Sequence, residues 1–421
     1  MRFERTVRLK TQNLRGGINT NRKGLRIFAF FLCMALVSGC WNRRELNELA
    51  VSVALGVDQK GNKLLLSNQM LNPGAIAGKE GGASPLAPVT LFQTSGGGLQ
   101  EASRKMTIVS TRKIYVGQVQ MIILGEEFAR KGVAKVLDYL SRDHEYRKDF
   151  FVVIARGAEA QDVLKVFTPL EKTPAYKMST SLETSSKVWG STAAVKIDEL
   201  ISAIISKGKD AVLTGIVVAG DTGIGNDKKN VEKILVPSSL KYSGLAVFKK
   251  DKLVGWLNEK ESKGYNYTQG KIKSTTILLA CPEEKNKKLA VELLRTKSET
   301  KVTMKENKPT IHIKLKTEGV ATDAQCARDF AKPATISELE HLTQSNIKAS
   351  IMSAVKKTQN VYKSDIFGFG EAVERKYPRY WESVKSDWDQ VFSNMQVIVQ
   401  VESKIHTMFK TTKSFSERME K

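Results

Sequence analysis

The chain has 421 residues, and 41% of them are hydrophobic, which excludes a disordered low-complexity protein and is enough for two or three packed domains. Its 67 basic residues outnumber the 44 acidic ones and give a net charge of +23, a balance that often accompanies nucleic-acid binding. With four histidines and four cysteines, the chain has little from which a zinc site is built, and we predict no metal site.

The first predicted element is a short apolar run, residues 27–37, which follows a basic stretch. It has about half of the roughly 20 apolar residues that a membrane-spanning helix needs. The run leads into Val37-Ser38-Gly39-Cys40, and the order of basic flank, short apolar core, small residues and cysteine is typical of a lipoprotein signal peptide. We therefore predict residues 1–39 as the signal peptide and Cys40 as the lipidated first residue of the mature chain. A small apolar cysteine in a buried helix is the alternative.

Lipidation of Cys40 would anchor the mature chain to a membrane without spanning it. Each buried methylene contributes about 0.8 kcal/mol, so two acyl chains hold a protein stably where one holds it only marginally. Export also argues against nucleic acid as a partner. Removal of residues 1–39 takes away eight basic residues and one acidic residue, which leaves 59 against 43. Membrane lipid, wall polymers or an acidic protein could meet this surplus, and a solvated surface explains it equally well.

Residues 40–219 alternate between strand and helix patterns, which predicts an N-terminal part with mixed α and β structure. Two β-rich runs around the turn residues 58–62 predict a hairpin. The other elements follow from apolar periodicity and from glycine and proline positions. In chain order the prediction is strands at 49–57 and 64–70, a loop at 72–89, a helix at 99–106, a strand at 113–124, a helix at 126–141, a strand at 150–155, helices at 158–166 and 194–206, and a strand at 211–219.

Glycine and charge replace apolar periodicity after residue 219, and we predict a linker at 220–238. The C-terminal domain, residues 239–421, is predicted as an antiparallel sheet with helices. Its strands are expected at 243–248, 253–257, 274–280, 310–316 and 395–401, and its long amphipathic helix at 336–361. The predicted fold class is α+β, multi-domain, with mixed and antiparallel β-sheets packed with α-helices.

Common catalytic motifs are missing. The sequence has no GxSxG and no HExxH, and none of its three Gly-Lys pairs is followed by Ser or Thr as a P-loop requires. We predict that the protein is not an enzyme and that it has no catalytic residue and no cofactor besides the covalent diacylglyceryl lipid on Cys40. The two cysteines of the mature body, Cys281 and Cys326, could form a disulfide or remain isolated buried thiols.

An aromatic segment, residues 364–392, is unusual in having two Phe, two Tyr and two Trp before a final Phe. Aromatic residues are enriched in protein interfaces. We therefore predict a partner interface at Phe367, Phe369, Tyr380 and Trp381. Core packing of a helical corner is the alternative and the more common role of such residues.

Three blocks of this sequence resemble the Ger(x)C family, the C subunits of spore germinant receptors: "GCWNRRELNELAVSVALGVD", "SGLAVFKKDKLVGWL" and "SDIFGFGEAVERKYPRYW". They lie near the start, middle and end of residues 40–410. The resemblance implies a lipoprotein on the outer face of the inner spore membrane that works with two integral membrane subunits, the A and B types. It also implies an α+β architecture of three domains and lipid attachment at Cys40.

The resemblance and the anchor together predict a non-catalytic, lipid-anchored subunit of a germinant receptor that is needed for the germination response to nutrients. The alternative is a membrane-anchored solute-binding lipoprotein that captures the nutrient itself. This alternative would need a cleft with convergent polar groups.

Overall fold

The computed structural model describes residues 24–28, 30, 48–76, 86–281, 286–325 and 332–406. Cys40 and Cys326 lie outside the described residues. The chain divides into two compact units, Met1–Leu49 and Ala50–Lys421, and the fold below is that of the second unit. Within the described ranges, no helix has both the length and the apolar composition needed to cross a membrane.

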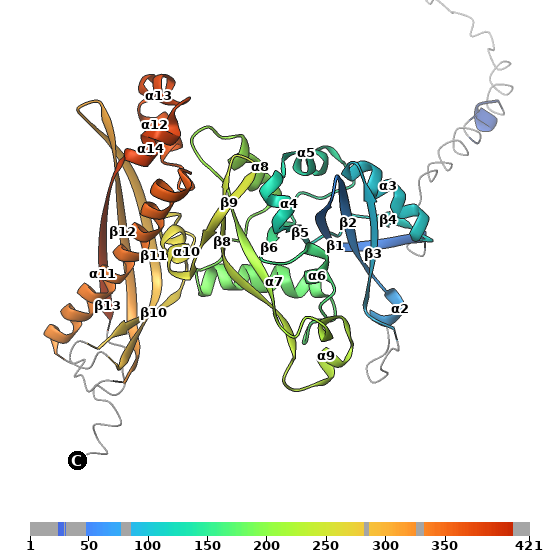
Figure 1. The fold of residues 1–421 in the computed structure, drawn as a ribbon, viewed down its shortest axis with the longest axis horizontal. Coiled ribbons are helices and arrows are strands. Elements are labelled where there is room, and N and C mark those ends of the chain that lie inside the picture. The colour runs from blue at the N-terminus through green and yellow to red at the C-terminus, as the bar shows by residue number, and fades with distance from the viewer. Residues whose placement is uncertain are drawn as a thin grey trace, which may run out of the picture. The chain divides into compact units, whose positions relative to one another are not determined.

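A mixed sheet of nine described strands forms the first half of this unit (Figure 1). Its strand order is β3-β2-β1-β5-β6-β7-β8-β9, and β4 pairs with β1 at one side. The four central strands run parallel, while both ends of the sheet are antiparallel. The strands are β1 (Leu49–Lys60), β2 (Lys63–Leu71), β3 (Val89–Gly96), β4 (Lys113–Tyr115), β5 (Met121–Gly125), β6 (Phe151–Ala155), β7 (Val212–Gly220), β8 (Ser238–Lys249) and β9 (Lys252–Leu257).

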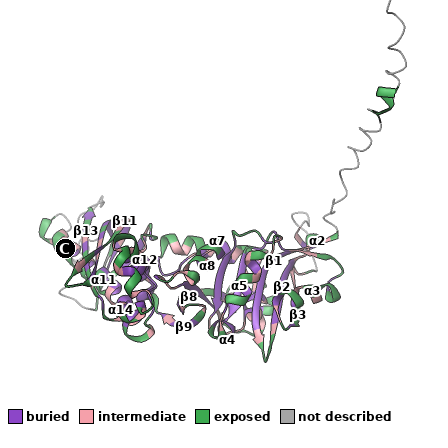
Figure 2. Cartoon of the chain, turned by 90° about the horizontal axis from the view of Figure 1, so that it is seen from above, coloured by how far each residue is buried: buried purple, intermediate pink, exposed green. Residues whose placement is uncertain are grey.

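Helices cover both faces of this sheet, because β5 and β6 are apolar at every position except Gly125 and are buried throughout. Alternate residues of β5 point to opposite faces: Ile122 belongs to one apolar core and Ile123 to the other. The first core takes residues from α3 (Leu99–Val109), α4 (Glu126–Lys131), α5 (Ala134–Arg142) and α8 (Ile197–Ile205), and the second from α6 (Ala160–Leu164) and α7 (Pro174–Val188). Figure 2 shows the strands largely buried and exposed residues on the helices.

The second sheet has the order β10-β11-β12-β13 and is backed by a long helix, α11 (Figure 1). Ile347 and Ile351 of α11 are fully buried in the same core as Ile311 and Ile313 of β12. The elements are α10 (Glu259–Thr268), β10 (Thr275–Ala280), β11 (Lys288–Lys305), β12 (Lys308–Ala324), α11 (Pro333–Lys357), the π-helical turn η3 (Thr358–Tyr362), α12 (Phe369–Lys376), α13 (Pro378–Val384), α14 (Trp388–Asn394) and β13 (Gln396–His406). Helix α10 contacts strands of both sheets.

The predicted α+β class with packed mixed sheets is confirmed, but several elements differ. The sequence patterns missed β3, α7, α10 and β11. The predicted helix 126–141 is two helices, because Gly132 has a φ of 127° and ends α4. The C-terminal sheet is not wholly antiparallel, since β13 runs parallel to β12 after the helices return the chain to the same end of the sheet.

The predicted linker lies inside a β-ribbon. Strand β8 pairs antiparallel with β7, and Gly220 stands opposite Ser238 across residues 221–237, which contain the short helices η2 (Ile224–Asn226) and α9 (Lys229–Glu232). The first sheet therefore continues through β9, and the change from one sheet to the other falls at α10. The glycine-rich and charged residues form a long loop within one sheet and not a linker between domains, because pairing between β7 and β8 holds the two ends of the loop together. Cys281, just after β10, is disulfide-bonded.

Candidate functional site

The loop after α8, residues 206–210, meets the start of the aromatic segment, residues 364–371, and we call this contact the junction. The backbone N–H of Asp210 donates to the carbonyl of Asp365 at 2.7 Å, and the N–H of Glu371 donates to the carbonyl of Gly208 at 3.2 Å. Ser364 Oγ donates to the carbonyl of Phe248, in β8, at 2.8 Å. The C-terminal segment is thus bonded directly to the first sheet and its following loop.

Two glycines let the backbones of the junction approach each other. A Cβ on Gly370 would lie 2.5 Å from the Cα of Gly208, and a Cβ on Gly208 would lie 2.6 Å from the backbone nitrogen of Glu371. Neither contact ends on a flexible side chain that could move away. Both positions therefore require glycine for the contact as it stands.

The carboxylate of Asp365 holds the turn that follows it. Its Oδ1 accepts the backbone N–H groups of Phe367, Gly368 and Phe369 at 3.1, 3.0 and 3.2 Å. Its Oδ2 accepts the N–H of Gly370 at 2.8 Å and the indole Nε1–H of Trp388 at 3.0 Å. The carboxylate thus caps a tight turn and accepts all five of these hydrogen bonds.

Burial raises the pKa of the Asp365 carboxyl to about 7, although the N–H groups of Gly370 and Phe369 and the Trp388 indole lower it. Asp365 is 1% exposed. Burial likewise raises the pKa of Asp210, against the hydrogen bonds from Lys250 and Ser364. The junction therefore places two carboxyl groups in surroundings that disfavour their charge.

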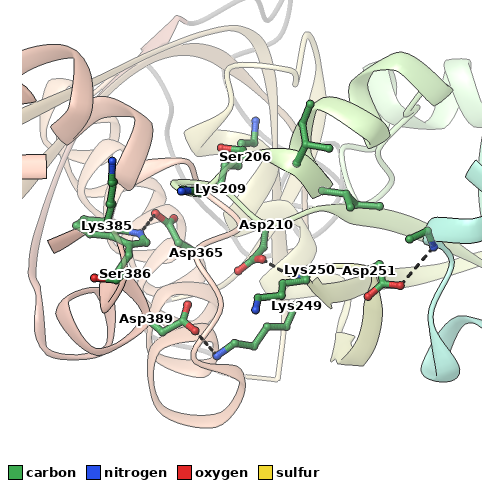
Figure 3. A pocket seen from close by; sticks show the side chains of 15 residues that line it. Ser206, Lys209, Asp210, Lys249, Lys250, Asp251, Asp365, Lys385, Ser386 and Asp389 are labelled. Atoms are coloured by element: carbon green, nitrogen blue, oxygen red, sulfur yellow. Dashed lines mark hydrogen bonds and ion pairs between the residues drawn. The ribbon is translucent and has the colours of Figure 1, made fainter. Parts of the chain in front are cut away.

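A pocket of about 570 Å³ opens beside the junction (Figure 3). Most of its lining comes from three segments distant in sequence, namely the end of α8 with the loop after it, the β8–β9 turn, and residues around α13 and α14, and Ala134 and Asp365 complete it. Its lining is rich in lysine and aspartate, and Ile204 and Ile205 of α8 are its aliphatic residues larger than alanine. The lining residues are Ala134, Ile204, Ile205, Ser206, Lys207, Lys209, Asp210, Lys249, Lys250, Asp251, Asp365, Lys385, Ser386, Trp388 and Asp389.

The pocket's lysines differ in whether an acid neutralises them. Lys249 Nζ lies 2.6 Å from Asp389 Oδ2 (Figure 3). Lys385 forms an ion pair with Glu382. The other three, Lys207, Lys209 and Lys250, form no ion pair with any described residue.

The pocket's aspartates are directed to hydrogen-bond donors rather than to these lysines. Asp251 Oδ2 accepts the backbone N–H of Ala134 at 3.3 Å, and Asp210 Oδ1 accepts the backbone N–H of Lys250 at 3.1 Å. The lining has no histidine and no cysteine. No group of three or more His, Cys, Asp or Glu suited to a metal occurs among the residues that the structure describes. What the arrangement offers is positive charge beside an apolar wall.

The predicted interface residues lie mostly inside the chain. Phe367, Phe369 and Trp381 are 6%, 1% and 2% exposed, and Tyr380 is half-buried. The rings of Phe367 and Phe369 stack with centroids 5.0 Å apart, and Trp381 meets the ring of Trp388 edge-on at 5.2 Å. Three of the four aromatic side chains thus form core, since the turn around Asp365 carries Phe367 and Phe369 and Trp381 of α13 packs on Trp388. Cys40, the predicted lipidation site, lies outside the described residues.

Sequence reasoning missed Asp365 and the unpaired lysines. An aspartate followed by Ile-Phe-Gly-Phe-Gly is a signal for a side-chain-capped turn, since glycine permits the backbone that such a cap needs, and Gly368 has a φ of 77°. The lysines offered no comparable signal, because they come from separate segments of the chain.

A second polar cluster holds the edge strand β9. The hydroxyl of Tyr362 accepts the backbone N–H of Trp256 at 3.0 Å and donates to its carbonyl at 2.8 Å. The Trp256 indole donates to Glu126 Oε1 at 3.1 Å, and the Arg156 guanidinium lies 4.7 Å from the centre of its ring. The hydroxyl of one tyrosine of η3 thus bonds the backbone N–H and C=O that a neighbouring strand would otherwise pair.

Known proteins match nearly the whole chain. Residues 42–218 match the family model of the spore germination protein N-terminal domain, and residues 243–408 match the C-terminal model described as spore germination B3/GerAC like. Spore germination protein KC of Bacillus subtilis (strain 168) is 30% identical over 378 residues, which cover 88% of this chain and 92% of that protein. Spore germination protein B3 of the same organism is 24% identical and covers 89% and 95%. The crystal structure of the GerBC protein matches with a TM-score of 0.54 and 23% identity, over 83% of this chain and 96% of that one, and so shows a shared fold.

Proposed function

The chain belongs to the Ger(x)C family of spore germination proteins, and we propose that it is the lipid-anchored, non-catalytic C subunit of a germinant receptor. A role in spore germination follows from the family itself. Two observations support the proposal of a lipid-anchored receptor subunit. The chain is similar to germination protein KC over nearly its full length, and its short apolar run is followed by small residues and Cys40. The subunit would be needed for the germination response to nutrients.

Lipidation of Cys40 would keep the folded unit near the bilayer. Nine residue steps separate Cys40 from Leu49, where β1 begins, and a fully extended chain covers at most about 3.5 Å per residue. The start of β1 would thus lie within roughly 30 Å of the lipidated residue. On the outer face of the inner spore membrane, this distance permits docking on two integral membrane subunits of the A and B types.

The pocket and the junction support a non-catalytic role. The buried aspartate of the pocket, Asp365, accepts five hydrogen bonds that fix a turn. A carboxylate used in this way has no lone pair directed to a substrate proton.

The test compares Cys40→Ala with Cys33→Ala, a matched control because Cys33 stands inside the apolar run and away from the cleavage site. Dormant-spore membranes are fractionated, the chain is recovered by affinity from detergent, and germination with nutrients is timed. Cys40→Ala should leave the membrane fraction, lose two co-purifying multi-span proteins and slow germination, while Cys33→Ala behaves as wild type. Membrane retention and normal germination in Cys40→Ala would refute the anchor's role.

The lysine-lined pocket favours one alternative function, a membrane-anchored solute-binding lipoprotein that captures the nutrient itself. A ligand that binds only the folded state raises the melting temperature, and the rise grows with the logarithm of its free concentration once this exceeds the dissociation constant. Nutrients that trigger germination should then raise the melting temperature of the purified chain, whereas nutrients that do not trigger it should leave it unchanged. The absence of any shift at saturating nutrient would count against this alternative.

A further inference from the structure

The pocket beside the junction has positive charge that the protein itself leaves unused. Lys207 and Lys250 are exposed and Lys209 is half-buried, and none of the three forms an ion pair with a described residue. Two aspartates of the same lining, Asp210 and Asp251, accept backbone N–H groups. An ammonium group without a carboxylate partner, at a concave site, is available to an incoming anion.

The backbone at Lys250 adds a second observation. Its φ is 53°, in the left-handed region that β-hairpin turns usually fill with Asn, Asp or Gly. The turn alone would not select a lysine at this position. Lys250 thus lines the pocket from a turn position whose backbone conformation costs some stability.

The rest of the lining suits an organic molecule rather than a bare ion. Ile204 and Ile205 at the end of α8 line the pocket, and Ile205 is 75% exposed although it is a large aliphatic side chain. A volume of about 570 Å³ lies within the usual range of small-molecule sites. An exposed isoleucine beside unpaired lysines gives one wall for an apolar group and one for charge.

We propose that this pocket binds a small organic anion whose carboxylate or phosphate is held by Lys207, Lys209 and Lys250 and whose apolar part lies against Ile205. Asp365 and Asp210 also line the pocket, but their carboxylates accept hydrogen bonds from the protein's own backbone N–H groups. This site does not depend on the receptor proposal, because its binding is measured on the purified chain.

The test is isothermal titration calorimetry on the full-length lipidated protein in detergent, with phenyl phosphate, benzoate, inorganic phosphate and phenol as probes. Phenyl phosphate or benzoate should bind saturably, more weakly at high salt, and phenol should not bind. The two organic anions distinguish a phosphate ligand from a carboxylate ligand. If neither anion binds the wild-type protein saturably, the proposal is overturned.

Two double variants separate the pocket from general surface charge. Lys207→Gln with Lys250→Gln should weaken binding of the organic anion about tenfold, as expected for two exposed charge contacts. Lys297→Gln with Lys404→Gln removes the same charge from exposed positions on the second sheet and should change binding less than about twofold. An equal loss in both double variants would overturn the assignment to this pocket. Ile205→Ser should weaken phenyl phosphate but not inorganic phosphate, and the opposite result would overturn the role given to the apolar wall.

Discussion

The Asp365 carboxylate gives the sharpest test of how the junction is held, and we expect Asp365→Asn to lower the free energy of unfolding by about 2 to 4 kcal/mol at pH 8. Oδ1 accepts three N–H groups and Oδ2 accepts two. Asparagine has nearly the same shape but places an NH₂ group where one oxygen stood. Whichever way the amide is turned, at least two donors of the protein then face another donor.

The magnitude follows from the two hydrogen bonds that the substitution must break. A hydrogen bond to a charged group contributes about 1.5 to 3 kcal/mol, so two contribute about 3 to 6 kcal/mol. Removing a buried charge offsets part of this loss. Asp365→Ala leaves all five donors without an acceptor and should lower the free energy of unfolding at least as much.

The assay is urea unfolding followed by tryptophan fluorescence. Asp323→Asn is the control, because Asp323 is exposed on β12 and makes no side-chain hydrogen bond with a described residue. The control should unfold as wild type. The reasoning is refuted if Asp365→Asn also unfolds at the wild-type urea midpoint, because the turn would then not depend on the carboxylate as acceptor.

Three further predictions concern the junction and the contact of Tyr362 with β9. Burial raises the pKa of Asp365 from 3.8 to about 7, so the folded chain keeps a proton that the unfolded chain releases. The free energy of unfolding should therefore fall as pH rises from 3.8 to about 7. Urea unfolding of Asp365→Asn at each pH should show a smaller decrease of the free energy with pH than wild type. An equal decrease in both proteins would contradict the assignment of this titration to Asp365. Gly370→Ala places a methyl group 2.5 Å from the Cα of Gly208 and should destabilise by about 1 to 3 kcal/mol in urea unfolding, whereas a neutral result would mean that the backbones separate freely. Tyr362→Phe keeps the ring but loses both hydrogen bonds to the backbone of Trp256, and should lower the free energy of unfolding by about 1 to 2 kcal/mol. An unchanged melting temperature would show that water replaces the hydroxyl.

Local pattern was most reliable where an element's own side chains decide its burial. The hairpin of β1 and β2 follows from two β-rich runs around a turn, and β5 and β6 follow from short, almost wholly apolar runs. Helix α10 was missed because its buried face consists of Tyr, Asn, Ser and Gly rather than aliphatic residues. Its Gly264 permits contact with the carbonyl of Ser350 in α11, a reason that periodicity does not carry.

The aromatic segment shows the same limit at the candidate site. Its composition predicted a surface for a partner, with core packing as the alternative, and the structure places Phe367, Phe369 and Trp381 in the core. The inward turn depends on Asp365 accepting five hydrogen bonds, one of them from Trp388 further along the chain. Composition shows that the segment is rich in aromatic residues, but it does not predict whether their side chains point into the core or toward solvent.

The sequence by itself determined the properties that depend on neighbouring residues, namely the α+β class and the three blocks that resemble the family, while the signal ending at Cys40 stays a prediction. Only the tertiary structure decided the position of the first sheet's end, the parallel pairing of β13, and the pocket with its unpaired lysines. The physical reason is that these features join segments far apart in the chain. Whether a lysine remains unpaired is decided by where the nearby carboxylates direct their oxygens, and that is fixed only when the segments meet.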